Sequence, residues 1–199
     1  MLAAVLLLPG LARGQTITAT SAQDYVTAIT EANGPPPAGV TVINSPAGTV
    51  ISLGSVTLPA IGTNAVLQIG SNTVDSPISG GAIVNNGSLV FTPPTGASDT
   101  ISTTITGSGQ VSQGWLGTLT FTDNGTNTYS GGTGTAANVV LGDGTTNIGT
   151  LGSGPVFGEG TLIFNEPRAI TFATSITDDV NVTQNGPGTV TFTDNGSNS

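Results

Sequence analysis

The stretch "GTLTFTDNGTNTYSGGT", residues 117–133, decides the fold, because the chain repeats its first twelve letters further on. Residues 188–199 read "GTVTFTDNGSNS", and nine of the twelve aligned positions are identical. The three changes, one Leu to Val and two Thr to Ser, keep the character of each side chain. Each copy alternates Thr with apolar residues, as a half-buried β-strand does, and then reaches an Asp-Asn-Gly turn.

A second pair of segments extends the repeat. "NGSLVF" at 86–91 is matched by "EGTLIF" at 159–164, so the repeating unit is about 71–73 residues long. The segments that follow, 100–113 and 170–184, also share a pattern. A unit of this length holds about three turns of a β-solenoid at roughly 20–25 residues per turn.

We therefore predict an all-β fold, a right-handed parallel β-helix (β-solenoid) with a short N-terminal capping helix. In such a stack each strand pairs with its equivalents in the turns above and below, roughly 4.8 Å away, so like side chains form ladders. Alternation places Leu119 and Phe121 on one face, and likewise Val190 and Phe192, and we expect both of these faces to be inner ones. The residues expected to recur at matching places are Val90, Phe91, Leu119, Phe121, Leu162, Phe164, Val190 and Phe192.

An immunoglobulin-type β-sandwich is the competing architecture. It fits the short strands, but the chain lacks Cys, and its single Trp, Trp115, lies in a segment flanked by Gly.

One segment near the N-terminus has helical periodicity instead. In "SAQDYVTAITEAN", residues 21–33, Ser21 is a suitable N-cap and Asp24 lies in the first turn. Tyr25, Val26 and Ile29 share a face with three Ala residues, and Asn33-Gly34 followed by three Pro ends the helix. We expect a cap over 15–40, with the helix at about 22–32, and a solenoid over 41–199 that is cut off mid-repeat.

The N-terminal segment "MLAAVLLLPGLARG", at positions 1–14, is typical of a signal peptide. It contains a short apolar core, with small residues at positions −3 and −1 before Gln15, although no Lys or Arg precedes the core. The segment is therefore predicted to be a signal peptide, either one whose true start lies upstream or a degenerate one, and a buried N-terminal strand is the alternative.

The composition excludes several partners. Only 7% of the residues are charged, against about 25% in ordinary domains. Acidic residues number 11 against two Arg, and the chain has no Lys or His. Binding to nucleic acid needs many basic side chains, so neither nucleic acid nor an anionic membrane surface is an expected partner.

The repeated segments resemble the autotransporter-associated β-strand repeat. "GTLTFTDNGTNTYSGGT" resembles its Gly-Thr-Leu-Thr-Leu-Thr strand and the Asn-Thr-Tyr-Ser-Gly-Gly-Thr that follows. "IGTLGSGPVFGEGTLIFN" (148–165) and "ITGSGQVSQ" (105–113) resemble its flanking segments, so the resemblance covers roughly 80–199. Residues 21–70, with "GTVISLGSVTLPAIG" (48–62), are similar to the capping helix and first coils of β-helical adhesins. "NEPRAITF" (165–172) departs from the pattern, keeping only Arg168 where the family often has Asn-Arg-Ser-Asp.

The resemblance implies a passenger segment of a bacterial autotransporter, secreted or displayed at the outer membrane of a Gram-negative cell. It also implies that an outer-membrane β-barrel follows the passenger in the full-length protein, while this segment itself does not insert into the membrane. The host surface or neighbouring cells are the implied partners.

The sequence offers little for catalysis. Without His or Cys, the usual nucleophilic triads and most zinc sites are excluded. Asp178-Asp179 is the only adjacent acidic pair, and it is interpreted as a solvated corner. Asp123, Asp143 and Asp194 each precede Gly or Asn-Gly, and turn chemistry is favoured there over calcium binding. "GGTGT" (131–135) is interpreted as a turn because it lacks the Lys of a phosphate loop.

Tyr129 is expected to pack against a neighbouring coil. We therefore expect no catalytic, cofactor-binding or metal-binding residues and no cofactor, in a non-enzymatic passenger segment that acts as adhesin or structural stalk. The alternatives are a fragment of a β-helical carbohydrate-active enzyme of the pectate-lyase type without its catalytic part, and a purely structural filament module.

Overall fold

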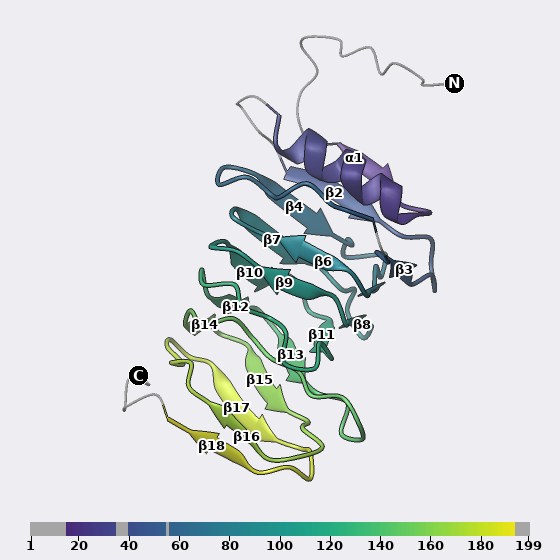
Figure 1. The fold of residues 1–199 in the computed structure, drawn as a ribbon. Helices are drawn as coiled ribbons and strands as arrows, with labels where there is room; N and C mark the ends of the chain where they lie inside the picture. Colours follow the sequence, from purple (N-terminus) through teal and green to yellow (C-terminus); the bar gives the residue numbers. More distant parts are fainter. Residues whose placement is uncertain (1–14, 35–39, 55, 194–199) are drawn as a thin grey trace, which may run out of the picture.

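The chain folds into a parallel β-solenoid of about eight turns, with one short helix at its N-terminal end (Figure 1). This computed structural model describes residues 15–34, 40–54 and 56–193. The predicted signal peptide at 1–14 and the predicted turn at Asp194 lie outside the described residues. Within them, the predicted all-β solenoid fold is confirmed.

Two seven-stranded parallel sheets form two faces of the solenoid. The first sheet contains, in spatial order, β1 (Thr16–Thr18), β2 (Val40–Asn44), β4 (Val66–Ile69), β7 (Ser88–Phe91), β10 (Gln110–Gln113), β12 (Thr133–Thr135) and β14 (Val156–Gly158). The second contains β3 (Ile51–Ser52), β5 (Ile78–Ser79), β8 (Ser98–Ile101), β11 (Thr118–Phe121), β13 (Asn138–Leu141), β15 (Thr161–Phe164) and β17 (Asn181–Gln184).

A third face is less regular, and its strands form only two short pairs. β6 (Ala82–Val84) pairs with β9 (Thr104–Thr106), and β16 (Ile170–Phe172) pairs with β18 (Val190–Phe192). Every named strand pair among the described residues is parallel, and the single antiparallel bridge joins Ser71 to Val74. A sandwich of the immunoglobulin type is built from antiparallel strands, so that alternative is wrong.

The core is a set of apolar ladders that run along the solenoid axis. Leu119, Val139 and Leu162 are paired in register in the second sheet, and so are Phe121, Leu141 and Phe164. All six side chains are buried. Phe91 meets Phe121 edge to face across the interior, with ring centroids 6.5 Å apart. The alternation read from the sequence therefore gives the correct inner face in these turns.

Of the expected inward positions, Val90 is wrong, while Val190 and Phe192 face the core but are incompletely covered. Val90 points outward and Leu89 takes the inner place, because alternation from the buried Phe91 selects residue 89. Val190 is only half-buried and Phe192 is 43% exposed. No described residue covers the far side of β18, although the Phe192 ring still meets Phe164 and Phe172 edge to face.

The two copies of the repeated line do not stack on each other, contrary to the expectation of matching places. Thr118 pairs with Asn138, Asn138 with Thr161 and Thr161 with Asn181, so three turns carry this sheet from Thr118 to Asn181. The second copy begins only at Gly188, so three turns are shorter than the repeat. The segment that repeats the sequence of β11 is β18, which lies in the third face and not in the second sheet. One sequence repeat therefore spans three full turns and one additional face.

The helix α1 spans Ala22–Ala32, as the periodicity predicted. Tyr25, Ala28 and Ile29 are fully buried against the first turns, and Val26 is half-buried. Figure 1 shows the helix lying across the end of the solenoid above β2 and β4. It therefore covers the interior of the first turn, which would otherwise be open to solvent.

Three short segments differ from the interpretation of the sequence. The segment 131–135 is not a turn throughout, since Thr133–Thr135 forms β12 with all three residues buried. β1, which pairs with β2, had no predicted counterpart. The alternating residues at 56–59 have the pattern of a strand but no strand structure.

Candidate functional site: a groove in the third face

Backbone hydrogen bonds link successive turns along most of the third face. The Ile61 amide donates to the Val84 carbonyl, β6 pairs with β9, and the Thr128 amide donates to the Ile105 carbonyl. One turn further on, the Ser153 amide donates to the carbonyl of Tyr129. Backbone hydrogen bonds therefore join the turns on the third face at every step from the first turn to residues 149–153, although strands pair in register only in β6 and β9. We call this series of hydrogen bonds the third-face ladder.

The ladder is interrupted at the next step. Between the segments 149–152 and 170–174, both fully described, no backbone hydrogen bond is formed. Their one hydrogen bond runs from the Thr174 hydroxyl to the Gly152 carbonyl, at 3.3 Å. The two turns stay joined on the other faces, where β13 pairs with β15 and Val156 forms a parallel bridge with Ile176. The gap is therefore local to one face.

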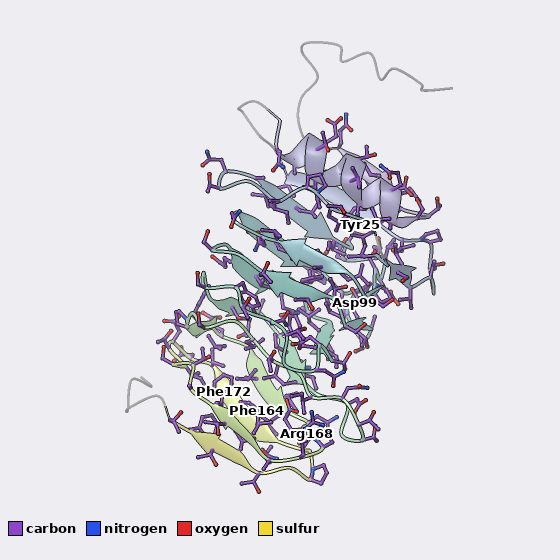
Figure 2. All side chains as sticks on the ribbon, in the orientation of Figure 1. Tyr25, Asp99, Phe164, Arg168 and Phe172 are labelled. Atoms are coloured by element: carbon purple, nitrogen blue, oxygen red, sulfur yellow. The ribbon has the colours of Figure 1, made fainter. Side chains whose placement is uncertain are left out.

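A groove of about 380 Å³ occupies this interruption. We call it the third-face groove; its walls are residues 149–153 and 170–174, with Asn127 and Thr128 at one side and Leu141 at its floor. Leu141, Leu151 and Phe172 are almost fully buried and line it with apolar surface. No residue among those lining it carries a charge. Figure 2 shows Phe172 beside Phe164 in the C-terminal turns that contain the groove.

Both walls turn unpaired backbone edges toward the groove. The Ile170 amide donates to the Thr189 carbonyl and the Phe172 carbonyl accepts from the Thr193 amide, so these two residues face β18. Alternate residues of a strand direct their N–H and C=O groups to opposite sides, so those of Thr171 and Ala173 face the groove. On the other wall, Thr150 bonds back to the preceding turn, which leaves the Leu151 backbone directed forward.

Three acidic residues stack at the corner that precedes the groove. Asp123, Asp143 and Glu166 each follow, by two positions, the paired Phe121, Leu141 and Phe164. Asp123 accepts hydrogen bonds from the amides of Thr126, Asn127 and Thr150. These bonds close the corner and join two turns. Asp123 is therefore a turn residue, as predicted.

Asp143 is saturated in the same way by its own loop. The amides of Thr146 and Thr145, followed by groups of Asn147, hold the pKa of the Asp143 carboxyl well below its ordinary value. A carboxylate with this many donors has no lone pair left for a cation. Asp143 is therefore also a turn residue.

Glu166 is the least satisfied member of the stack. Its side chain is fully buried; Oε1 accepts one hydrogen bond from the Gly149 amide at 3.2 Å, and Oε2 has no partner. Burial raises the pKa of Glu166 to about 7, and the charge of Asp123 adds to this, while Arg168 opposes it. The carboxyl is out of reach of a bound saccharide, because none of its surface is exposed.

Asp99 is a second buried carboxyl, in the N-terminal half of the molecule (Figure 2). It occupies an inner position of β8, directly in register with Leu119. Its two oxygens accept from the Ser76 amide at 3.1 and 3.3 Å, and the Ser76 hydroxyl accepts from the Ser45 amide. Burial raises the pKa of Asp99 to about 6. This polar column joins three turns inside an apolar core.

The remaining sequence candidates lie apart from the groove. Asp178 and Asp179 are exposed in a turn, as predicted. Asp178, whose backbone φ is 60°, accepts a hydrogen bond from the Gly158 amide. Arg168 is exposed and donates to the Thr146 carbonyl. Tyr129 is fully buried, as predicted, and its hydroxyl bonds the Thr133 hydroxyl at 2.7 Å.

Sequence reasoning missed Asp99, Glu166 and the groove. The alternation of buried and exposed positions does indicate that the two carboxyls are buried. Asp99 lies two positions before the buried Ile101, and Glu166 lies two positions after the buried Phe164. The groove has no such pattern, because it results from a missing ladder between two segments that lie one turn apart.

No family model, no curated protein and no solved structure matches the chain. Across the described ranges, no three acidic, His or Cys side chains gather in a way that would hold a metal ion. In the same ranges, no helix is both long and apolar enough to cross a membrane.

Proposed function

We propose that this chain is a non-enzymatic passenger segment of a secreted or surface-displayed bacterial autotransporter, acting as an adhesin or structural stalk. The observation that supports it most is the solenoid itself: two parallel sheets run unbroken through its turns, and the helix α1 covers one end. Such a body is rigid along its axis and presents long faces of Thr, Ser and Asn to its surroundings.

The hydrogen bonds of three acidic side chains support a structural role. Asp123 and Asp143 accept hydrogen bonds from their own turns, and Asp99 holds neighbouring turns together. Each of these carboxyls acts on the solenoid's own backbone. None of them is free to work as a general acid or base on a bound substrate.

Export and display are tested in the bacterium that carries the gene. The full-length protein, tagged within the exposed loop 143–148, should be detected on intact cells and be removed by external protease. Detection only after lysis would contradict display.

The non-enzymatic part has its own test. The purified chain is incubated with a panel of plant and bacterial polysaccharides, with and without calcium, and new reducing ends and unsaturated sugars are measured. We expect no turnover above that of the heat-unfolded chain. Measurable release of saccharide would overturn this part of the proposal and favour the carbohydrate-active alternative.

A further inference from the structure

We propose that the third-face groove binds an uncharged, extended peptide strand, which completes the interrupted ladder. The proposal rests on the groove alone and does not depend on where the protein is displayed. Its failure and the failure of the proposed function are therefore separate results.

The first support is the free strand edge of β16. Within the described chain, β16 pairs with β18 on one side only, and its other side faces the groove. An edge with unpaired N–H and C=O groups is the template to which an extended peptide adds. Across the groove, the backbone of Leu151 supplies one further N–H and one further C=O group.

The second support is the lining. Leu141, Leu151 and Phe172 form an apolar floor, and Thr128, Thr171 and Ala173 lie at the exposed rim. A strand places alternate side chains on opposite sides, so an apolar residue would enter the floor while its neighbours face solvent. The chain's own strands, which alternate Thr with Val, Leu or Phe, have this pattern.

The third support is the absence of charge among the lining residues. A charged side chain entering the groove would lose its hydration without gaining a partner, which costs several kcal/mol. The groove therefore selects segments whose inward-facing side chains are uncharged. It also has limited length, because the hydrogen bond from Thr174 to Gly152 closes one end. About three strand residues, roughly 10 Å, fit beside residues 170–172.

The test uses the purified chain and a labelled, end-blocked peptide with the sequence Gly-Thr-Val-Thr-Phe-Thr. Binding is followed by fluorescence anisotropy, and the site by backbone amide hydrogen exchange. We expect saturable binding that slows exchange at Leu151, Thr171 and Ala173. Two versions of the same peptide, methylated at one or the other alternate set of backbone nitrogens, keep the side chains but each lose the N–H donors of one edge. The version that loses the edge paired with β16 should bind at least roughly tenfold more weakly.

Two substitutions provide a matched pair. Ala173→Arg places a large charged side chain at the rim and should weaken binding by roughly tenfold or more. Ala82→Arg makes the same change at an exposed position of the same face, where the ladder is continuous, and should leave binding unchanged. Circular dichroism checks that both variants are folded. If Ala173→Arg is unfolded, the methylated peptides, which need no variant, still test whether backbone pairing holds the peptide.

Three outcomes would overturn the proposal. The first is no saturable binding of the unmodified peptide. The second is protection that appears at β17 and β18 instead of the groove, which would mean that the peptide adds to the open end of the solenoid. The third is that both methylated versions bind as tightly as the unmodified peptide, which would show that backbone pairing plays no part.

Discussion

At the scale of single residues, the buried carboxyl of Asp99 makes the fold sensitive to pH. Burial favours its neutral form, so its pKa in the folded chain, about 6, lies above its ordinary value of 3.8. The folded chain then binds an extra proton between these two pH values. The stability that Asp99 contributes is therefore greatest at low pH and decreases as the pH rises from about 4 to about 6.

The substitution Asp99→Asn should remove this pH dependence. The Asn carbonyl still accepts from the Ser76 amide but cannot ionise. The unfolding free energy of the variant minus that of the wild type should therefore be about 1–2 kcal/mol larger at pH 7.5 than at pH 3.5. Urea unfolding at both pH values measures it. An equal difference between the two proteins at both pH values would show that Asp99 keeps an ordinary pKa.

Asp143→Asn is the matched control. The pKa of Asp143 is lowered by the amides of its loop, so its contribution is present at neutral pH and is lost in acid. Its removal should change the pH dependence in the direction opposite to that of Asp99→Asn.

At the scale of elements, the start of α1 depends on one carboxylate. Asp24 Oδ2 accepts from the amides of Thr20 and Ser21 at 2.8 and 2.9 Å, and these bonds lower the pKa of Asp24. Asp24→Ala should therefore cost about 1 kcal/mol at pH 7. The loss should shrink as the pH falls below about 4, where the wild-type carboxylate is itself protonated. Thermal unfolding at pH 7 and pH 3 checks this, and a loss independent of pH would contradict it.

The close approach of successive turns at one corner of the solenoid requires glycine. Gly87, Gly109 and Gly131 lie in successive turns, and a Cβ atom on Gly109 would lie 2.3 Å from the Gly87 carbonyl oxygen. Gly109→Ala should cost more than roughly 2 kcal/mol, because the backbones of two turns must separate. Gly96→Ala has open space and only an unfavourable φ of +78°, so it should cost roughly 1 kcal/mol. Equal losses of unfolding free energy for the two variants in urea would mean that the turns at this corner can separate at little cost.

The elements also show how far the sequence predicts the molecule. The helix at 22–32 and the inner positions Leu119 and Phe121 follow from periodicity, because each face they bury is continuous. The strand at 40–44 also follows, but its buried positions are Thr41 and Ile43 and Val40 is exposed, so alternation alone does not give its inner face. β12 was missed because Thr and Gly carry no apolar alternation. The placement of Val190 on the third face depends on the unequal lengths of successive turns, which are set by corner loops such as 143–148.

The candidate site was less predictable than the fold. The residues that line the groove are ordinary apolar and uncharged polar ones, and none of them is a marker of binding. What distinguishes the groove is the missing backbone pairing between residues 149–152 and 170–174, which is a relation between turns. A single sequence carries information on strands and corners, but not on which neighbouring turns fail to pair.

At the scale of the whole molecule, the two ends of the solenoid differ in protection. The first turn is covered by α1, and Ile43, Leu67 and Ile69 beneath it are fully buried. At the other end all four residues of β17 are exposed, and Val182 is 46% exposed. In a stack whose turns contact only their neighbours, local stability is set by the number of covered sides. Opening should therefore begin at β17 and β18 and progress toward the helix.

Hydrogen exchange on the purified chain tests this gradient with matched amides. Thr120, Val140, Ile163 and Thr183 occupy one register line of the second sheet, and the amide of each is directed to the preceding turn, so their hydrogen bonding is the same and only their depth in the stack differs. Losing one covering turn removes most of the burial of the neighbouring Leu or Val side chains, worth roughly 2–3 kcal/mol, so the Thr120 amide should exchange at least about fiftyfold more slowly than that of Thr183. Val140 and Ile163 should follow in order of depth. Equal rates along this line would mean that the solenoid opens as one cooperative unit, and the helix would then protect both ends alike.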